Sequence, residues 1–182
     1  SIDVLWKRIA ALGETDPMAA LDLLCSTLER VNRERGPQSL DAARWVQAIA
    51  TPLIAYLNRF DEAEQLLAQA RPILERNLGP YTAELAELHV ASAWMAFRRG
   101  NLTASAESWT AALAIRERVP GEKQVELQKV LVGLAQVRLS QRRFDEALAL
   151  AERSEAILQA NGETVSEAAA AVKNLMANIA LA

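Results

Sequence analysis

A motif that recurs every 42 residues limits the fold of this chain more than any other feature of its sequence. Phe60, Leu102 and Phe144 open three similar segments, and each lies 42 positions after the one before. A further step of 42 positions back from Phe60 reaches Met18, which opens a fourth segment. A fixed period of this length indicates a repeat protein, in which each unit buries its apolar faces by stacking on its neighbours.

Within each period the sequence predicts two helices joined by a turn. Thr82 and Asn101 stand where the N-caps of the central pair belong, and Asp16 stands at the start of an earlier helix. Thr164 and Glu167 have the spacing of a capping box that would open the last helix. The expected helices cover about 3–13, 16–35, 40–57, 60–78, 82–99, 102–119, 123–141, 144–161 and 164–182.

Small residues recur at equivalent places in the second helix of each unit. A hairpin that packs both on its partner and on the next hairpin needs small side chains where the backbones approach, with larger apolar neighbours filling the remaining space. We therefore expect buried small residues at two sets of equivalent positions, Ala63, Ser105 and Ala147 in one set and Ala70, Ala112 and Ser154 in the other.

The segments Arg59-Phe-Asp-Glu-Ala-Glu and Arg143-Phe-Asp-Glu-Ala-Leu resemble the second helix of the tetratricopeptide repeat (TPR). The usual repeat is about 34 residues long, and the longer period with Leu78-Gly79-Pro80 is similar to the kinesin-light-chain subtype. The resemblance implies an all-α fold, a right-handed TPR-like superhelical solenoid of antiparallel helix hairpins with about nine helices. It implies one domain over 1–182, with units at about 1–36, 39–79, 82–121 and 123–162 and a final helix at 164–182.

Composition argues against several classes of function. The net charge is −3 and the pI is about 5.3, whereas a general nucleic-acid binder needs an excess of Lys and Arg to displace counterions. Cys25 is the single cysteine, which excludes an intrachain disulfide and a cysteine-based zinc site. No apolar run approaches the length of a membrane span. We expect a cytoplasmic protein that binds neither nucleic acid nor a membrane through this region.

The sequence offers little support for catalysis. His89 is the single histidine and has no Ser, Cys or metal-ligand companion at a useful spacing. Cys25 shares a helical face with apolar residues, which predicts a buried structural thiol. The acidic residues are spread singly, and Glu87 and Glu62 are interpreted as parts of solvated faces. We therefore expect a chain that is not an enzyme and that holds neither a cofactor nor a metal.

Arginines stand at the turn between the two helices of successive units. Arg59, Arg98-Arg99 and Arg142-Arg143 occupy these turns and would form a basic row along one edge of a solenoid. The first interpretation is solubility together with favourable charge near helix C-termini. The other is a site for an anion or an acidic partner.

Four tryptophans carry the hypothesis of a binding site. Trp109 takes the large aromatic position of a second helix and is expected in the core. Trp6, Trp45 and Trp94 lie in first helices, which line the concave face of the family that the chain resembles, so each is either a groove residue or a core residue. The resemblance implies a partner-binding set of Trp45, Tyr56, Glu87, Val90, Trp94, Phe97, Arg98, Lys129, Gln136, Asn174 and Asn178.

These features favour a non-catalytic scaffold module that binds a peptide or a helix of a protein partner in its concave groove. One alternative is a ligand- or partner-sensing domain of a larger bacterial transcription regulator or kinase, because repeats of this kind resemble those of bacterial signalling regulators. The start at Ser1 fits a fragment of such a protein. Another alternative is a homodimer formed through the apolar helix at 164–182.

Overall fold

The computed structural model describes residues 9, 11–12, 15–119, 124–163 and 166–182. Within these residues it contains helices and no strand, as the composition indicates. The helix expected at 3–13 falls mainly outside the described residues, as do Trp6 and Thr164. The helices of the described part are α2 (Pro17–Arg35), α3 (Leu40–Ala55), α4 (Phe60–Leu78), α5 (Ala83–Arg98), α6 (Leu102–Arg116), α7 (Gln124–Ser140), α8 (Phe144–Ala160) and α9 (Glu167–Ala180). These eight helices match eight of the expected ranges to within three residues at each end.

Side-chain caps explain where several of these helices begin. Asp16 accepts a hydrogen bond from Ala19 N at 3.0 Å, and Asn101 accepts one from Ala104 N at 3.1 Å, as expected from the sequence. The capping box expected at Thr164 is wrong, because the N-cap of α9 is Ser166, which accepts a hydrogen bond from the backbone three residues on. Each cap satisfies an amide that the first helical turn leaves without a partner.

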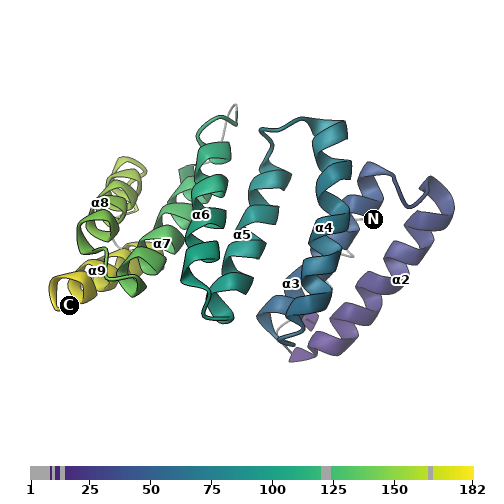
Figure 1. Ribbon diagram of the computed structural model, residues 1–182, viewed down its shortest axis with the longest axis horizontal. Helices are drawn as coiled ribbons and strands as arrows, with labels where there is room; N and C mark the ends of the chain where they lie inside the picture. The colour runs from purple at the N-terminus through teal and green to yellow at the C-terminus, as the bar shows by residue number, and fades with distance from the viewer. Residues whose placement is uncertain (1–8, 10, 13–14, 120–123, 164–165) are drawn as a thin grey trace. The chain divides into compact units, whose positions relative to one another are not determined.

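The described residues divide into two compact units, Ser1–Pro80 and Tyr81–Ala182. In unit 1, α3 packs against both α2 and α4, and Figure 1 shows the three helices side by side. Leu24, Leu53 and Leu74, one from each helix, are buried in its core.

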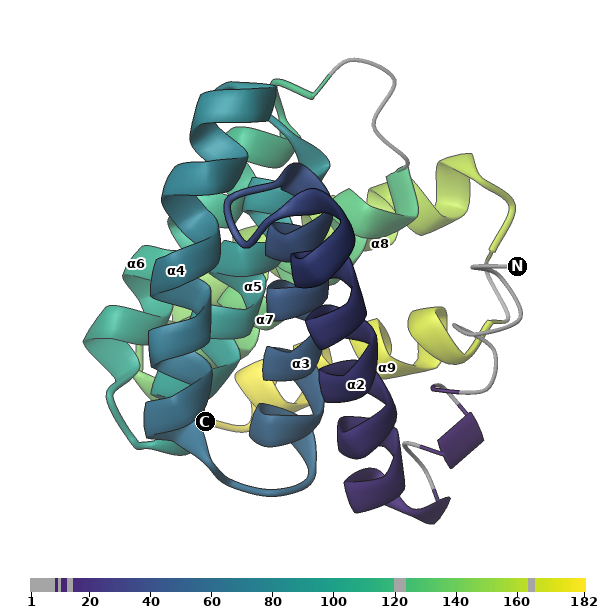
Figure 2. The same ribbon diagram turned by 90° about the vertical axis from the view of Figure 1, so that its right-hand side faces the viewer.

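Unit 2 contains two helical hairpins and a further helix. The pairs α5–α6 and α7–α8 are antiparallel, α6 packs on α7, and α9 packs on α8 and more lightly on α7. Figure 1 shows α9 close to α7 and α8, and Figure 2 gives the view turned by 90°. The large apolar residues of α9, Val172, Leu175 and Ile179, are buried within the unit. A homodimer through α9 stays a prediction, and it would have to use the remaining face, which carries mostly alanine and asparagine.

The expected small residues are where backbones approach. All six are fully buried, and two of them are serines that form hydrogen bonds. Ser105 donates to the Ala93 carbonyl oxygen at 2.8 Å, and Ser154 accepts from Gln128 Nε2 at 3.1 Å. The small size and the satisfied hydroxyls together confirm the packing expected from the repeat.

The turns between paired helices share one backbone geometry. Asn58, Gly100 and Arg142 occupy equivalent places in three successive 42-residue repeats. Each has a positive φ, of 56°, 77° and 62° respectively. A positive φ is easily adopted by glycine but unfavourable for a residue with a Cβ. The 42-residue repeat therefore extends to the conformation of the turn.

None of the described helices is long and apolar enough to cross a membrane.

Candidate functional site

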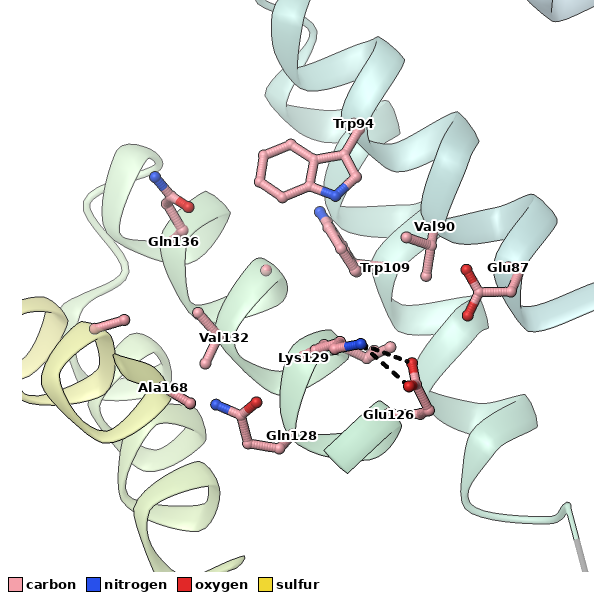
Figure 3. Close-up of a pocket in the computed structure, with 13 residues that line it drawn as sticks. Glu87, Val90, Trp94, Trp109, Glu126, Gln128, Lys129, Val132, Gln136 and Ala168 are labelled. Carbon is pink, nitrogen blue, oxygen red and sulfur yellow. Dashed lines mark hydrogen bonds and ion pairs between the residues drawn. The ribbon is translucent and has the colours of Figure 1, made fainter. Parts of the chain in front are cut away.

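Unit 2 contains a hollow of about 400 Å³ beside Trp94, which we call the Trp94 hollow. Figure 3 shows its walls, which come from α5, α6, α7 and α9. Its lining residues are Glu87, Val90, Trp94, Trp109, Glu126, Gln128, Lys129, Val130, Val132, Gly133, Gln136, Ala168 and Ala171.

Trp94 is a large aromatic side chain held in place while still open to solvent. It is 40% exposed, and its ring meets that of Trp109 edge to face, with centroids 5.5 Å apart and an interplanar angle of 79°. The Phe97 ring meets it at 6.1 Å and 87°. Edge-to-face pairs of this kind are favourable for aromatic rings. The contacts therefore orient Trp94 without covering the surface that it presents to the hollow.

Trp109 forms the floor of the hollow, and its core position, expected from the sequence, is confirmed by an exposure of 2%. Gly133 of α7 makes this possible, because a Cβ at that position would lie 2.4 Å from Trp109 Cζ2. Sequence reasoning missed this pair, although a glycine inside a helical pattern is itself a signal of a close approach. Trp109 Nε1 is buried with no hydrogen-bond partner among the described residues, and Figure 3 shows it pointing toward Trp94.

One end of the hollow is charged. Lys129 Nζ lies 3.1 Å from Glu126 Oε1 on the same helix, and Arg116 of α6 donates through Nη2 to Glu87 Oε1. The Arg116 side chain is only 4% exposed. Sequence reasoning missed Arg116, although it lies seven residues after Trp109 and therefore on the same buried face of α6.

Glu87 is exposed, as the interpretation of a solvated face expects, but its environment also perturbs its ionisation. Partial burial raises the pKa of Glu87, and the neighbouring Glu126 carboxylate raises it further. Arg116 and Lys129 lower the same pKa but do not cancel the effect of burial. The Glu87 carboxylate is thus less well stabilised than one in open solvent, although half of its side chain is exposed.

The structure brings five of the expected binding residues into one place. Glu87, Val90, Trp94, Lys129 and Gln136 all line the Trp94 hollow.

Four other expected residues of unit 2 do not line the Trp94 hollow. Phe97 is half-buried and supports Trp94 from the side. Arg98 is exposed at the end of α5, and Asn174 and Asn178 are exposed on α9.

The two expected residues of unit 1 differ from each other. Trp45 on α3 is 8% exposed and belongs to the core of that unit. Tyr56 follows the last residue of α3 and is 50% exposed. Trp45 therefore offers little surface to a partner, whereas Tyr56 stays available for contact.

The expectation that Cys25 is buried is wrong, because the residue is exposed on α2. Leu21, Leu24 and Thr27 face the core, and one step along a helix turns the next side chain away from that face. Partial burial, Asp22 and Glu29 all raise the pKa of the Cys25 thiol, with Arg59 acting in the opposite sense. A raised pKa makes the thiol a weaker nucleophile at neutral pH.

In the part of the chain that the structure describes, no group of His, Cys, Asp or Glu side chains gathers to hold a metal ion.

The arginines of the turns form short-range ion pairs. Arg59 Nε donates to Glu62 Oε1 at 2.6 Å, and Arg143 Nε donates to Glu146 Oε1 at 2.7 Å. Both pairs link the residue before a second helix to the first turn of that helix. Arg59 and Arg143 are thus engaged in local contacts at the starts of α4 and α8, and the two interpretations of the basic residues stay predictions.

Comparison with known proteins agrees with the helical-repeat fold of the structure. Residues 84–160 match the model of the tetratricopeptide repeat family, and no curated protein matches the chain in sequence.

Two crystal structures resemble the chain along most of its length. One contains the nearly identical TPR-like repeats of a putative kinesin light chain from Podosopora anserina, with a TM-score of 0.78, 17% identity, and coverage of 99% of this chain and 85% of that one. The other is BtubC (BKLC) from P. vanneervenii, with a TM-score of 0.73 and 20% identity over 80% of this chain. This chain spans 58% of the length of BtubC. The chain thus has the fold of TPR-like repeats, and its residues 84–160 match the model of the tetratricopeptide repeat family.

Proposed function

We propose that this chain is a non-catalytic protein-binding module and that its Trp94 hollow takes an extended segment or a helix of a partner protein. Tetratricopeptide repeats generally mediate protein–protein interactions and typically serve as scaffolds. The proposal assigns that role to one place on the surface of unit 2, where an apolar side chain of the partner would pack on Trp94.

The observation that carries the proposal is the exposure of Trp94 beside a hollow. Tryptophan is common among the residues that contribute most to binding, especially where it lies next to a pocket. Burying the exposed 40% of Trp94 would remove roughly 100 Å² from water, which is worth about 2.5 kcal/mol at about 25 cal/mol per Å². That free energy corresponds to a change in affinity of about 50-fold.

The experiment needs a partner, and peptides selected from a random display library on the intact chain provide one. The Trp94→Ala variant should bind the selected peptides about 50-fold more weakly than the parent chain does. Tyr81→Ala is a matched control, because Tyr81 is an exposed aromatic residue of the same unit that does not line the hollow. Circular dichroism should show both variants folded.

Equal affinity of the parent and Trp94→Ala chains for the selected peptides would overturn the proposal. So would a loss of binding that accompanies unfolding of the Trp94→Ala variant, since Trp94 would then be a core residue.

A further inference from the structure

The Trp94 hollow has two chemically different ends. Trp94 lies near one end and Glu87, seven residues earlier on α5, lies near the other, so the two are separated by about 10 Å along the helix. Figure 3 shows Glu126 and Lys129 at the Glu87 end. The wall between the two ends is apolar and includes Val90 and Val132.

The charged end contains two carboxylates and two cations, and each cation is paired with one carboxylate. Arg116 is engaged by Glu87 and is almost fully buried, and Lys129 is engaged by Glu126. Each carboxylate has two oxygens and about four acceptor positions. Glu87 uses one oxygen for Arg116, and both oxygens of Glu126 lie within hydrogen-bond distance of Lys129 Nζ, so each carboxylate keeps acceptor positions. The side chains of Glu87 and Glu126 remain 48% and 32% exposed. Burial raises the pKa of Glu87 and the Glu126 carboxylate raises it further, whereas Arg116 and Lys129 lower it.

A second observation, independent of the carboxylates, also points to a ligand. Trp109 Nε1 is a buried donor without an acceptor among the described residues, and it points toward Trp94 in the hollow. A buried donor usually has a hydrogen-bond partner. A backbone carbonyl of a bound segment is the kind of acceptor that this donor lacks.

We propose that the Trp94 hollow selects a partner segment in which a lysine or arginine lies between Glu87 and Glu126 while an apolar side chain of the same segment packs on Trp94. The aliphatic stem of the basic residue would follow the apolar wall of the hollow. In an extended segment, side chains on one face are about 7 Å apart, so the basic residue should stand two or three positions from the apolar one. An acidic residue at the same place would face both carboxylates. This inference rests on the proposed function and adds the chemistry of the partner.

The peptides selected on the intact chain test the inference directly. Sequences whose binding depends on Trp94 should be enriched in lysine or arginine two or three positions from an aromatic or large aliphatic residue. Peptides that depend on Trp94 but are acidic or uncharged at those positions would overturn the inference while leaving the proposed function intact. If the parent chain enriches nothing over the Trp94→Ala variant, both fail.

A paired substitution locates the basic side chain. Glu126→Gln should weaken binding of the best selected peptide by about three- to tenfold, as expected for a partly exposed charged contact. The same peptide with norleucine in place of its basic residue should bind the parent and Glu126→Gln chains equally, because the interacting pair is then already lost.

Two further variants complete the design. Glu87→Gln should act like Glu126→Gln. If the loss of the Arg116 contact destabilises this variant, it should weaken the basic and norleucine peptides alike, so a weakening of the basic peptide alone still reports the charged contact. Glu152→Gln is the control, since Glu152 is exposed on α8 outside the hollow. Equal weakening of the basic and norleucine peptides by Glu126→Gln would overturn the inference.

Discussion

Replacing Gly133 by alanine should destabilise the chain, although alanine is normally the better helix former. A Cβ at Gly133 would lie 2.4, 2.5 and 2.7 Å from three atoms of the Trp109 ring, whereas ordinary contact begins at 3.4 Å. The ring would have to retreat by about 1 Å. It has little room to do so, because Trp109 is 2% exposed and its other neighbours are also packed.

Two opposing effects set the size of the change. Overpacking of a filled core costs about 1–3 kcal/mol, and a clash with three ring atoms belongs near the upper end of that range. Removing a glycine from a helix interior contributes about 1 kcal/mol in the stabilising direction. The expected net effect of Gly133→Ala is therefore a loss of about 2 kcal/mol in the free energy of unfolding.

Urea unfolding followed by circular dichroism measures this difference, and Trp109→Phe supplies the control. Phenylalanine lacks the part of the indole ring that the new Cβ would meet. In the Trp109→Phe background, Gly133→Ala should then be neutral or should stabilise the chain by about 1 kcal/mol. The double-mutant cycle should give a coupling of about 2–3 kcal/mol. Stabilisation of the parent chain by Gly133→Ala, or a coupling near zero, would refute the packing argument.

Three more outcomes are expected. Ser154→Ala should cost about 1–3 kcal/mol in urea unfolding, because it leaves the buried Gln128 amide without its acceptor. Arg142→Gly should stabilise the chain by up to about 1 kcal/mol, because it relieves the positive φ that Gly100 adopts freely in the preceding unit; destabilisation would contradict this. Burial raises the pKa of Glu87, so protonation favours the folded state. The free energy of unfolding of the parent, relative to that of Glu87→Gln, should therefore rise as the pH falls from neutral through that raised pKa. If this difference between the two chains does not change with pH, the pKa of Glu87 is not raised.

Local signals were enough to predict most of the fold. The positions of the helices follow from apolar periodicity, from caps such as Asp16 and Asn101, and from turn residues such as Gly79, all of which act within a few residues. The error at the start of α9 has the same local origin. Thr164 and Ser166 are both good capping residues, and the N-cap of α9 is Ser166.

The site was predicted less completely, because its main contacts join residues far apart in the sequence. Five of the residues that line the hollow from α5 and α7 were expected, since resemblance to a known repeat places them on one face: Glu87, Val90, Trp94, Lys129 and Gln136. The contact of Gly133 with Trp109 and the hydrogen bond of Arg116 to Glu87 join residues 24 and 29 positions apart. Such pairs depend on the rotation of each helix in the packed unit. A change of one residue in register turns a side chain by about 100°, as the exposed Cys25 beside the buried Leu24 shows.

The most direct test of the binding site is to follow the indole N–H signals of the tryptophans by NMR while a selected peptide is added. The account predicts that the Trp94 and Trp109 signals shift in proportion to the peptide bound, because both side chains line the hollow. The signal of Trp45, buried in unit 1, should stay in place. A peptide that binds while the Trp94 and Trp109 signals remain unchanged would contradict the account.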